Sequence, residues 1–123
     1  MSRTLLVYDD DPDILALVAR VAESAGYDTC GTQTNDQFWT CYDDCVPTAI
    51  VLDLVVPEVS GIDVLIELGN RGCNAPILVM SGYHREVLNS ARRLGGTYGL
   101  DVRDIIPKPF DIADLKAKLE EIG

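Results

Sequence analysis

Basic residues are scarce in this chain of 123 residues, where ten lysines and arginines stand against twenty aspartates and glutamates. The formal net charge is therefore −10. A domain with this imbalance repels phosphate backbones and anionic lipid headgroups, so we expect it to bind neither nucleic acid nor a membrane surface directly. The same imbalance suits a domain that binds cations. Places where the acidic residues gather are therefore the first candidates for a functional site.

Long apolar runs are also missing. No stretch approaches the ~20 residues that span a bilayer. The start "MSRTLLVYDDD" lacks the layout of a signal peptide, because aspartates interrupt its apolar run almost at once. We expect a cytoplasmic protein. Hydrophobic residues make up 47% and charged residues 24%, as in a soluble globular chain, and the length predicts a single domain over residues 1–123.

No C-x-x-C pair occurs among the four cysteines, which are Cys30, Cys41, Cys45 and Cys73. Cys41 and Cys45 lie one helical turn apart and could act as metal ligands. The interpretation that we favour is core packing, because Phe38 and Tyr42 share their helical face and free cysteine packs as a small hydrophobe. Cytoplasmic proteins also rarely contain disulfides.

Short apolar runs are what the chain does contain. They are "TLLVY" (4–8), the weaker "YDTCG" (27–31), "TAIVL" (48–52), "PILVM" (76–80) and "DIIP" (104–107). Runs that are apolar at nearly every position are typical of strands buried on both faces of a parallel sheet. Amphipathic segments separate the runs and carry helix caps at Asp11, Thr34 and Asp111 and a stop at Gly26. This alternation predicts a doubly wound α/β domain, with right-handed crossovers and helices on both faces.

The predicted strand ends carry the chemistry. Ligands of such sheets bind at the carboxyl ends of the strands. The residues found there are Asp9, Asp10, Asp53, Ser81 and Lys108. Clustered carboxylates suit Mg²⁺, and a carboxylate can attack phosphorus to form an acyl phosphate. A lysine and a hydroxyl can stabilise the charge that develops on phosphoryl oxygens.

Four stretches in order resemble the CheY-like receiver (REC) domain of two-component response regulators: "LLVYDDDPDIL", "IVLDLVVPEVSGIDVL", "PILVMSGY" and "IIPKPF". The resemblance covers the chain from end to end. It implies a flavodoxin-like five-stranded sheet in the order 2-1-3-4-5. It also implies a phosphoacceptor that takes a phosphoryl group from a sensor histidine kinase or phosphotransfer protein. Such a domain catalyses its own phosphorylation and dephosphorylation, and it changes conformation to control a partner or effector.

The resemblance also implies a role for each residue at the strand ends. Asp53 would be the phosphoacceptor. Mg²⁺ would be bound by Asp10 directly, by Asp9 largely through water, by Asp53 and by the backbone carbonyl of Val55. This pattern leaves Asp11 to cap the following helix.

Two further residues would contact the phosphoryl group. Ser81 would donate a hydrogen bond to a phosphoryl oxygen. Lys108 would pair first with the Asp53 carboxylate and then with the phosphate. The resemblance implies a cis peptide bond between Lys108 and Pro109. The single histidine, His84, has none of the surroundings of a phosphoryl-carrying histidine, and we expect it at the surface or at the rim of the site.

Two alternatives stay open at this point. One is a phosphatase of the haloacid dehalogenase type, with Asp9 as nucleophile and Asp11 as the second acid of its D-x-D motif. Against it, Asp13 stands where that family has threonine or valine, and no acidic pair follows a later strand. The other is a degenerate receiver that works by binding alone, which the filled chemical positions disfavour.

The chain departs from the receiver pattern at Ile105, where most receivers have an aromatic residue. We expect Tyr83 to move in its place, together with the fourth helix and the segment from Gly95 to Gly99. The fourth helix, last strand and last helix would then form the surface for a partner or a homodimer, as the resemblance implies. The stretch "RRLGGTYGLDVRD" also resembles receivers joined to EAL-type phosphodiesterase domains.

Overall fold

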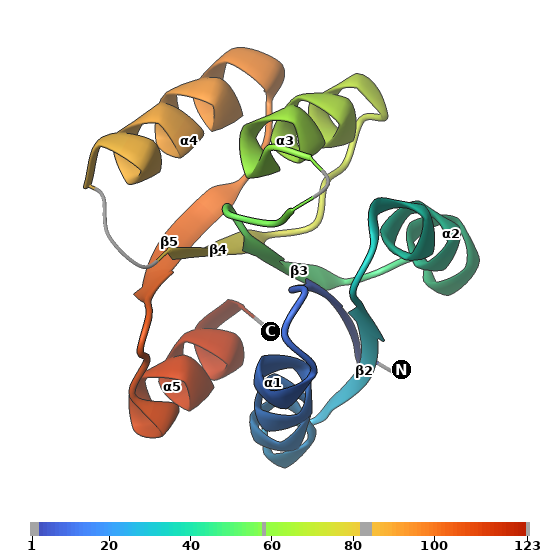
Figure 1. Ribbon diagram of the computed structural model, residues 1–123, viewed down its shortest axis with the longest axis vertical. Helices are drawn as coiled ribbons and strands as arrows, with labels where there is room; N and C mark the ends of the chain where they lie inside the picture. Colours follow the sequence, from blue (N-terminus) through green and yellow to red (C-terminus); the bar gives the residue numbers. More distant parts are fainter. Residues whose placement is uncertain (1–2, 58, 82–84, 123) are drawn as a thin grey trace.

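The computed structural model describes residues 3–57, 59–81 and 85–122, with backbone only for 85–88. Within these ranges five strands alternate with five helices (Figure 1). The strands are β1 (Arg3–Tyr8), β2 (Tyr27–Thr32), β3 (Ala49–Asp53), β4 (Ile77–Ser81) and β5 (Val102–Pro107). The helices are α1 (Pro12–Ser24), α2 (Asn35–Cys45), α3 (Gly61–Asn70), α4 (Arg85–Tyr98) and α5 (Ile112–Ile122).

The strands form one parallel sheet in the order β2-β1-β3-β4-β5. This confirms the predicted fold class and strand order. Helices α1 and α5 lie on one face, and α2, α3 and α4 lie on the other (Figure 1). Predicted strand ends are within two residues of the observed ones, and the largest difference is that β5 begins at Val102. No helix in the described ranges combines the length and apolar character needed to cross a bilayer.

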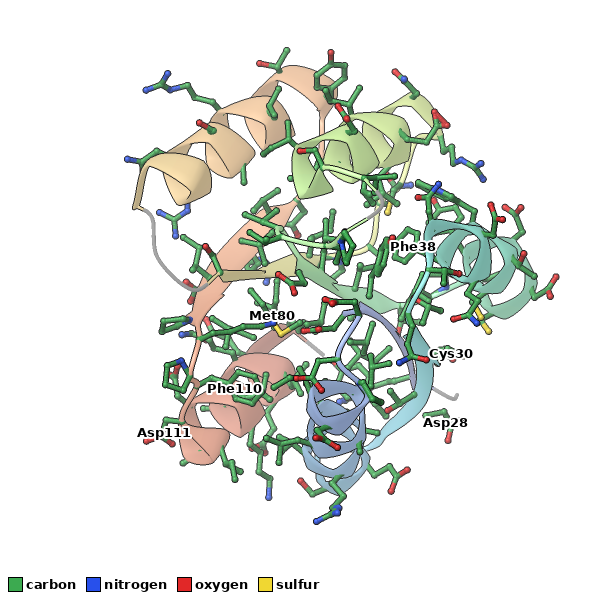
Figure 2. All side chains as sticks on the ribbon, in the orientation of Figure 1. Asp28, Cys30, Phe38, Met80, Phe110 and Asp111 are labelled. Carbon is green, nitrogen blue, oxygen red and sulfur yellow. The ribbon has the colours of Figure 1, made fainter. Side chains whose placement is uncertain are left out.

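Alternate residues of β1, β3 and β4 enter two separate cores. In β1, Leu5 and Val7 pack toward α1 and α5, while Leu6 and Tyr8 pack toward the other three helices. Figure 2 shows Phe38 of α2 and Met80 of β4 on opposite sides of the sheet. Burial of both faces explains why the strands read as continuous apolar runs. It also fixes the positions of the strand ends that carry the polar residues.

The predicted helix caps are confirmed. Asp11, Thr34 and Asp111 each accept a backbone N–H from the first turn of the helix that follows, at 2.8 to 3.2 Å. Gly26 follows the end of α1 with a φ of 91°, in the left-handed region where glycine is favoured. Asp11 therefore serves the start of α1, which leaves Asp9 and Asp10 for the rim of the sheet.

Helix α4 includes Gly95 and Gly96, in the segment where the sequence predicts the weakest backbone restraint. The helix continues through both, and at Gly95 the tertiary packing requires a residue without a side chain. A Cβ at Gly95 would lie 2.8 Å from Cγ2 of Val102 in β5. Helix α3 also has a glycine that its packing requires, because a Cβ at Gly69 would lie 2.5 Å from the Cβ of Tyr98 in α4. Packing of α4 on its neighbours therefore overrides its low helix propensity.

These two adjacent glycines of α4 should respond oppositely to alanine. A Cβ at Gly96 meets nothing within 4 Å, so Gly96→Ala should stabilise the protein by about 0.5–1 kcal/mol through helix propensity. Gly95→Ala should instead destabilise it by about 1–3 kcal/mol, because the new methyl group overpacks against Val102. Urea unfolding measures both. Equal effects of the two substitutions would show that α4 does not pack on β5 in this way.

Candidate functional site

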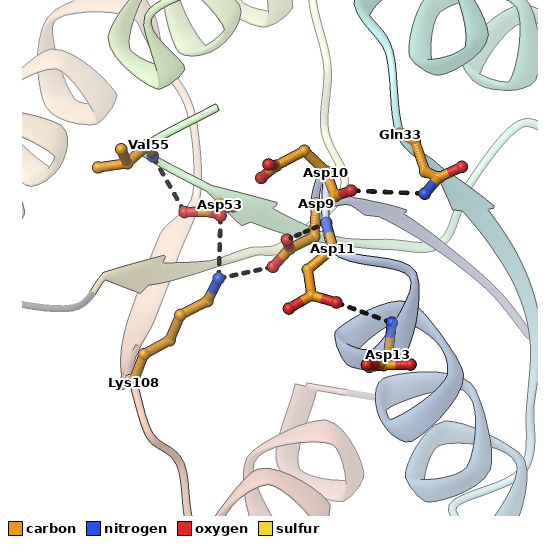
Figure 3. A network of polar contacts seen from close by, with 8 residues as sticks. All are labelled: Asp9, Asp10, Asp11, Asp13, Gln33, Asp53, Val55 and Lys108. Carbon is orange, nitrogen blue, oxygen red and sulfur yellow. Dashed lines mark hydrogen bonds and ion pairs between the residues drawn. The ribbon is translucent and has the colours of Figure 1, made fainter. Parts of the chain in front are cut away.

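The carboxyl ends of the strands bring the predicted polar residues to one rim (Figure 3). Asp9 directly follows β1, and Asp53 is the last residue of β3. Ser81 is the last residue of β4, and Lys108 directly follows β5. Asp10 lies beside Asp9 and is exposed. The parallel sheet thus gathers residues that are as many as 99 positions apart in the sequence.

Lys108 connects two buried carboxylates. Its Nζ lies 2.7 Å from Oδ2 of Asp9 and 2.9 Å from Oδ2 of Asp53 (Figure 3). Asp9 is fully buried and Asp53 is 4% exposed. Burying carboxylates without a partner is costly, so the ammonium group offsets much of that cost. The resemblance led us to expect the contact with Asp53, whereas the contact with Asp9 is a finding of the structure.

Two carboxylates share one ammonium group here, and this arrangement shifts the pKa values of Asp53 and Lys108. Burial raises the pKa of Asp53 above its ordinary value of 3.8, although the N–H of Val55 and Lys108 act in the opposite direction. Burial lowers the pKa of Lys108, but the hydrogen bonds and charges of Asp9 and Asp53 outweigh it and leave that pKa above 10.5. Lys108 is therefore firmly protonated, and the site retains an excess of negative charge.

The loop after β3 holds the other oxygen of Asp53. The backbone N–H of Val55 donates to Oδ1 of Asp53 at 3.0 Å. Val55 also forms an isolated antiparallel bridge with Ser60, which narrows the loop. The N–H of Gly61, the first residue of α3, donates to the carbonyl of Leu54 at 3.2 Å. These contacts fix the backbone beside the carboxylate.

Gly61 allows this loop to close, and a side chain there should disrupt it. A Cβ at position 61 would lie 2.4 Å from the Cα of Leu54. This Cα is a backbone atom, so it cannot move aside as a flexible side chain could. We expect Gly61→Ala to lower the free energy of unfolding by about 3 kcal/mol, as overpacking does at rigid sites. The control is Gly31→Ala, whose Cβ would meet Leu15 at an ordinary 3.5 Å. Urea unfolding measures both, and equal losses would contradict this account.

The three acids also fit a divalent cation. One carboxylate oxygen from each of Asp9, Asp10 and Asp53 lies within 4.8 Å of the others. Among the described residues this is the one such group of acidic, histidine or cysteine side chains. Mg²⁺ prefers oxygen ligands and binds proteins through few carboxylates, so the donor set suits it. The role of the Val55 carbonyl as a further ligand stays a prediction.

Thr32 contributes to the site although sequence reasoning passed over it. Its carbonyl accepts the backbone N–H of Asp9 at 3.1 Å, and its buried hydroxyl donates to the carbonyl of Val7 at 2.7 Å. These bonds fix the backbone from which the Asp9 carboxylate projects. The sequence offered one indication of this role, a threonine at the end of β2, whose apolar pattern is weak. In the sheet Thr32 pairs with Tyr8 of β1.

Ser81 lies on the same rim because it is the last residue of β4. It is buried, and its carbonyl accepts the N–H of Lys108 at 2.9 Å. Ile105 is half-buried and packs against the core beneath α2, α3 and α4. Tyr83 and His84 lie outside the described residues, so the expectations for them stay predictions. The peptide bond between Lys108 and Pro109 is cis, as expected.

The phosphatase alternative finds no support in this geometry. Its nucleophile would be Asp9, which is fully buried. One oxygen of Asp9 accepts the N–H of Asp11 at 2.9 Å, and the other is bonded to Lys108. Asp11 is occupied as the cap of α1. Burial and occupied oxygens apply equally to Asp53, so what sets the phosphatase aside is that Ser81 and Lys108, rather than an acidic pair, stand at the ends of the later strands β4 and β5.

Known sequences are similar to this chain over nearly its whole length. A family described as "Response regulator receiver domain" matches residues 5–120. The chain is 29% identical over 122 residues to the alkaline phosphatase synthesis transcriptional regulatory protein PhoP of Bacillus subtilis, covering 99% of the chain and 49% of that protein. It is 30% identical over 122 residues to the transcriptional regulatory protein CpxR of Klebsiella pneumoniae, with the same two coverages. The chain thus spans about half the length of the curated relatives it matches.

Solved structures share the fold. NtrX from Brucella abortus, in a complex with ATP, superimposes with a TM-score of 0.86 at 27% identity, over 99% of this chain and 27% of that chain. The receiver domain of the Francisella response regulator 1452 gives 0.84 at 23% identity, over 98% and 96%. The chemotaxis protein CheY4 of Vibrio cholerae gives 0.83 at 18% identity, over 100% of both chains. At these last two identities the likeness concerns the fold alone.

Proposed function

Since this chain belongs to the response regulator receiver domain family, we propose that Asp53 is the residue that accepts the phosphoryl group. The observation that carries the proposal is the environment of the Asp53 carboxylate. Lys108 binds one of its oxygens and the N–H of Val55 binds the other. Both oxygens are thus held in place before a donor arrives, which lowers the cost of orienting the nucleophile.

The proposed reaction transfers a phosphoryl group from a phosphohistidine. An oxygen of the Asp53 carboxylate attacks phosphorus, an O–P bond forms and the P–N bond breaks. The imidazole leaves with the bonding electron pair. The product is an acyl phosphate, and attack of water on its phosphorus breaks the O–P bond, releases inorganic phosphate and returns the free carboxylate. In this proposal the protein supplies positioning and charge for both steps, so it catalyses its own phosphorylation and dephosphorylation.

Two side chains would stabilise the phosphoryl oxygens. Lys108 would exchange its contact with Asp53 for one with a phosphoryl oxygen, and its contact with Asp9 would serve as an anchor. Ser81, at the neighbouring strand end, would donate its hydroxyl proton to another oxygen. Such charge-assisted hydrogen bonds are stronger than those that the hydroxyl makes to neutral groups. The pull on Ser81 is the proposed start of the conformational change.

We further propose that Mg²⁺ is held by Asp9, Asp10, Asp53 and the Val55 carbonyl. When bound, it supplies positive charge opposite the phosphoryl oxygens. Asp10 is the exposed one of the three acids, so it is the acid best placed to accept an ion from solvent. Asp9 is already committed to Lys108, which agrees with an indirect role.

Phosphoryl uptake from a small donor tests the proposed function. We expect phosphoramidate with Mg²⁺ to add one phosphoryl group to the protein, as measured by intact mass. Hydroxylamine should remove that group, because it cleaves acyl phosphates and leaves phosphoserine intact. A chelator should prevent uptake. Uptake that is unaffected by the chelator, or a product that resists hydroxylamine, would refute the proposal.

Mg²⁺ should also stabilise the unphosphorylated protein. A ligand at one hundred times its dissociation constant adds about 2.7 kcal/mol to the free energy of unfolding. Asp10→Asn should remove most of this effect, since it removes one ligand charge without changing side-chain size. Asp13→Asn is the matched control, because Asp13 lies in the first turn of α1 outside the acidic group. Thermal unfolding with and without Mg²⁺ measures both, and equal responses would place the ion elsewhere.

The partners follow from the same proposal. The phosphoryl donor would be a sensor histidine kinase or a phosphotransfer protein in the cytoplasm. The curated relatives named above are transcriptional regulators about twice as long, so their outputs cannot be transferred from this domain alone. The face formed by α4, β5 and α5 is the proposed surface for a partner or a homodimer. The net charge of −10 supports a protein partner rather than nucleic acid for this domain.

A further inference from the structure

Two cysteines from different elements are in direct contact, and neither belongs to the group of three acids. Sγ of Cys30 in β2 lies 2.9 Å from Sγ of Cys45, the last residue of α2. Figure 2 labels Cys30 on β2, the edge strand that α2 partly covers. Both side chains are half-buried, so small reagents can reach them. A disulfide bond is about 2.05 Å long, and small side-chain rotations would close the remaining gap.

We propose that Cys30 and Cys45 form a redox-active pair, which closes to an intramolecular disulfide by exchange with a low-molecular-weight disulfide such as oxidised glutathione. One cysteine thiolate attacks the external disulfide, forming a mixed disulfide and releasing one reduced thiol. The second cysteine then attacks the protein sulfur of the mixed disulfide and releases the other thiol. The two cysteines are oxidised by two electrons, and the external disulfide is reduced to two thiols.

The other two cysteines are poorer partners. Cys41 precedes Cys45 by one turn of α2, and side chains at that spacing have Cβ atoms about 5–6 Å apart. A disulfide needs a Cβ separation of about 3.5–4.5 Å. Cys73 is buried among the core residues. Cys41 packs against this core, as the sequence predicts for Cys41 and Cys45, and Cys30 packs against it too. Cys45 instead lies half-buried beside Cys30. The alternative of a cysteine metal site finds no support among the described residues.

Proximity, rather than thiol acidity, is the basis of this reactivity. Burial raises the pKa of Cys30 to about 12, and the hydrogen bond and charge of Cys45 act in the same direction. Burial likewise raises the pKa of Cys41. Such thiols are slow nucleophiles, so Cys30 is suited to the second, intramolecular step. There the contact with Cys45 provides a high effective concentration.

The bond would tie the end of α2 to the edge of the sheet. Val46 follows Cys45 with a φ of 47°, which a β-branched side chain rarely adopts, and it is 75% exposed. The exposed Val46 side chain therefore buries little surface that could offset the backbone strain at this end of α2. The disulfide would close a loop between residues 30 and 45. For a loop of this size we expect the melting temperature to rise by about 10 °C.

The test exposes the whole chain to a series of glutathione redox buffers, followed by alkylation and intact mass measurement. We expect a species that has lost two hydrogen atoms, with peptides around Cys30 and Cys45 linked, and with the higher melting temperature. Cys41→Ser should behave as the wild type. Cys30→Ser should stop at a glutathione adduct on Cys45, whereas Cys45→Ser, which keeps only the slow thiol of Cys30 from this pair, should form neither the disulfide nor a rapid adduct. Adducts alone in the wild type, or a linkage through Cys41 or Cys73, would overturn the proposal. None of these readouts depends on Asp53, so failure here and failure of the proposed phosphoacceptor are separate results.

Discussion

Asp53→Asn is expected to take up no phosphoryl group from phosphoramidate under conditions in which the wild type is fully labelled. The amide has nearly the size and shape of the carboxylate, but it lacks the anionic oxygen that attacks phosphorus. The fold should survive, because burial already disfavours the charged form of Asp53 and raises its pKa. The amide oxygen can still accept the N–H of Val55. The measurement is intact mass over a time course, with thermal unfolding as the check on folding.

The matched control for this prediction is Asp63→Asn. Asp63 is an exposed acid in the first turn of α3, on the element that follows the loop after β3. It should be labelled at the wild-type rate. Partial labelling of Asp53→Asn that is stable to hydroxylamine would show a secondary hydroxyl acceptor, and hydroxylamine-sensitive labelling would show that another carboxylate is the nucleophile. The second outcome would contradict the assignment of Asp53.

Much of this fold could be predicted from the sequence because most of its strands, all but the edge strand β2, are locally distinctive. A strand such as Ile77–Ser81 is apolar at nearly every position and has helices on both faces, so its pattern and its environment agree. The caps at Asp11 and Thr34 rest on contacts within three residues, which a sequence displays directly. The chemistry at the strand ends followed from a general property of parallel sheets.

The features that sequence reasoning missed all depend on distant contacts. The bond from Lys108 to Asp9 joins residues 99 positions apart and depends on the register of β1, β3, β4 and β5. The extension of α4 through Gly95 depends on Val102 of the next strand, against the local propensity of glycine. Contact between Cys30 and Cys45 depends on how α2 lies on an edge strand whose own sequence pattern is weak.

Lys108→Met should destabilise the metal-free protein by about 3 kcal/mol at pH 7, because removing one partner of a buried ion pair leaves charge without compensation. In this site two buried carboxylates, Asp9 and Asp53, lose their shared ammonium group. Methionine keeps the apolar stem of the side chain, so packing changes little. Urea unfolding in the presence of a chelator measures the effect. The control is Lys116→Met on α5, where the part of the chain that the structure describes provides no ion pair for Lys116.

The pH dependence of that loss has a definite sign. In the wild type the pKa of Lys108 is raised by its acidic partners, so its contribution is present below pH 10.5 and disappears as pH rises through the raised value. Asp53 already has a raised pKa, so the folded state holds its proton more tightly than the unfolded state does. Removing Lys108 raises that pKa further. Lys108→Met should therefore regain stability as pH falls, and its free energy of unfolding should approach that of the wild type in acid.

Mg²⁺ should reduce the difference in stability between Lys108→Met and the wild type at pH 7. The two acids that lose their contact with Lys108 are among the three acids proposed to hold the ion. The melting temperature of Lys108→Met should accordingly rise more with Mg²⁺ than that of the wild type, in which the ion and the ammonium group compete for the same carboxylates. Phosphoryl uptake by the variant should stay slow even at saturating Mg²⁺. An ion bound by the three acids does not replace the positive charge that Lys108 places at the end of β5. An equal response of the two proteins to Mg²⁺ would mean that Lys108 and the ion act at separate places, and the shared-carboxylate description of this site would then be wrong.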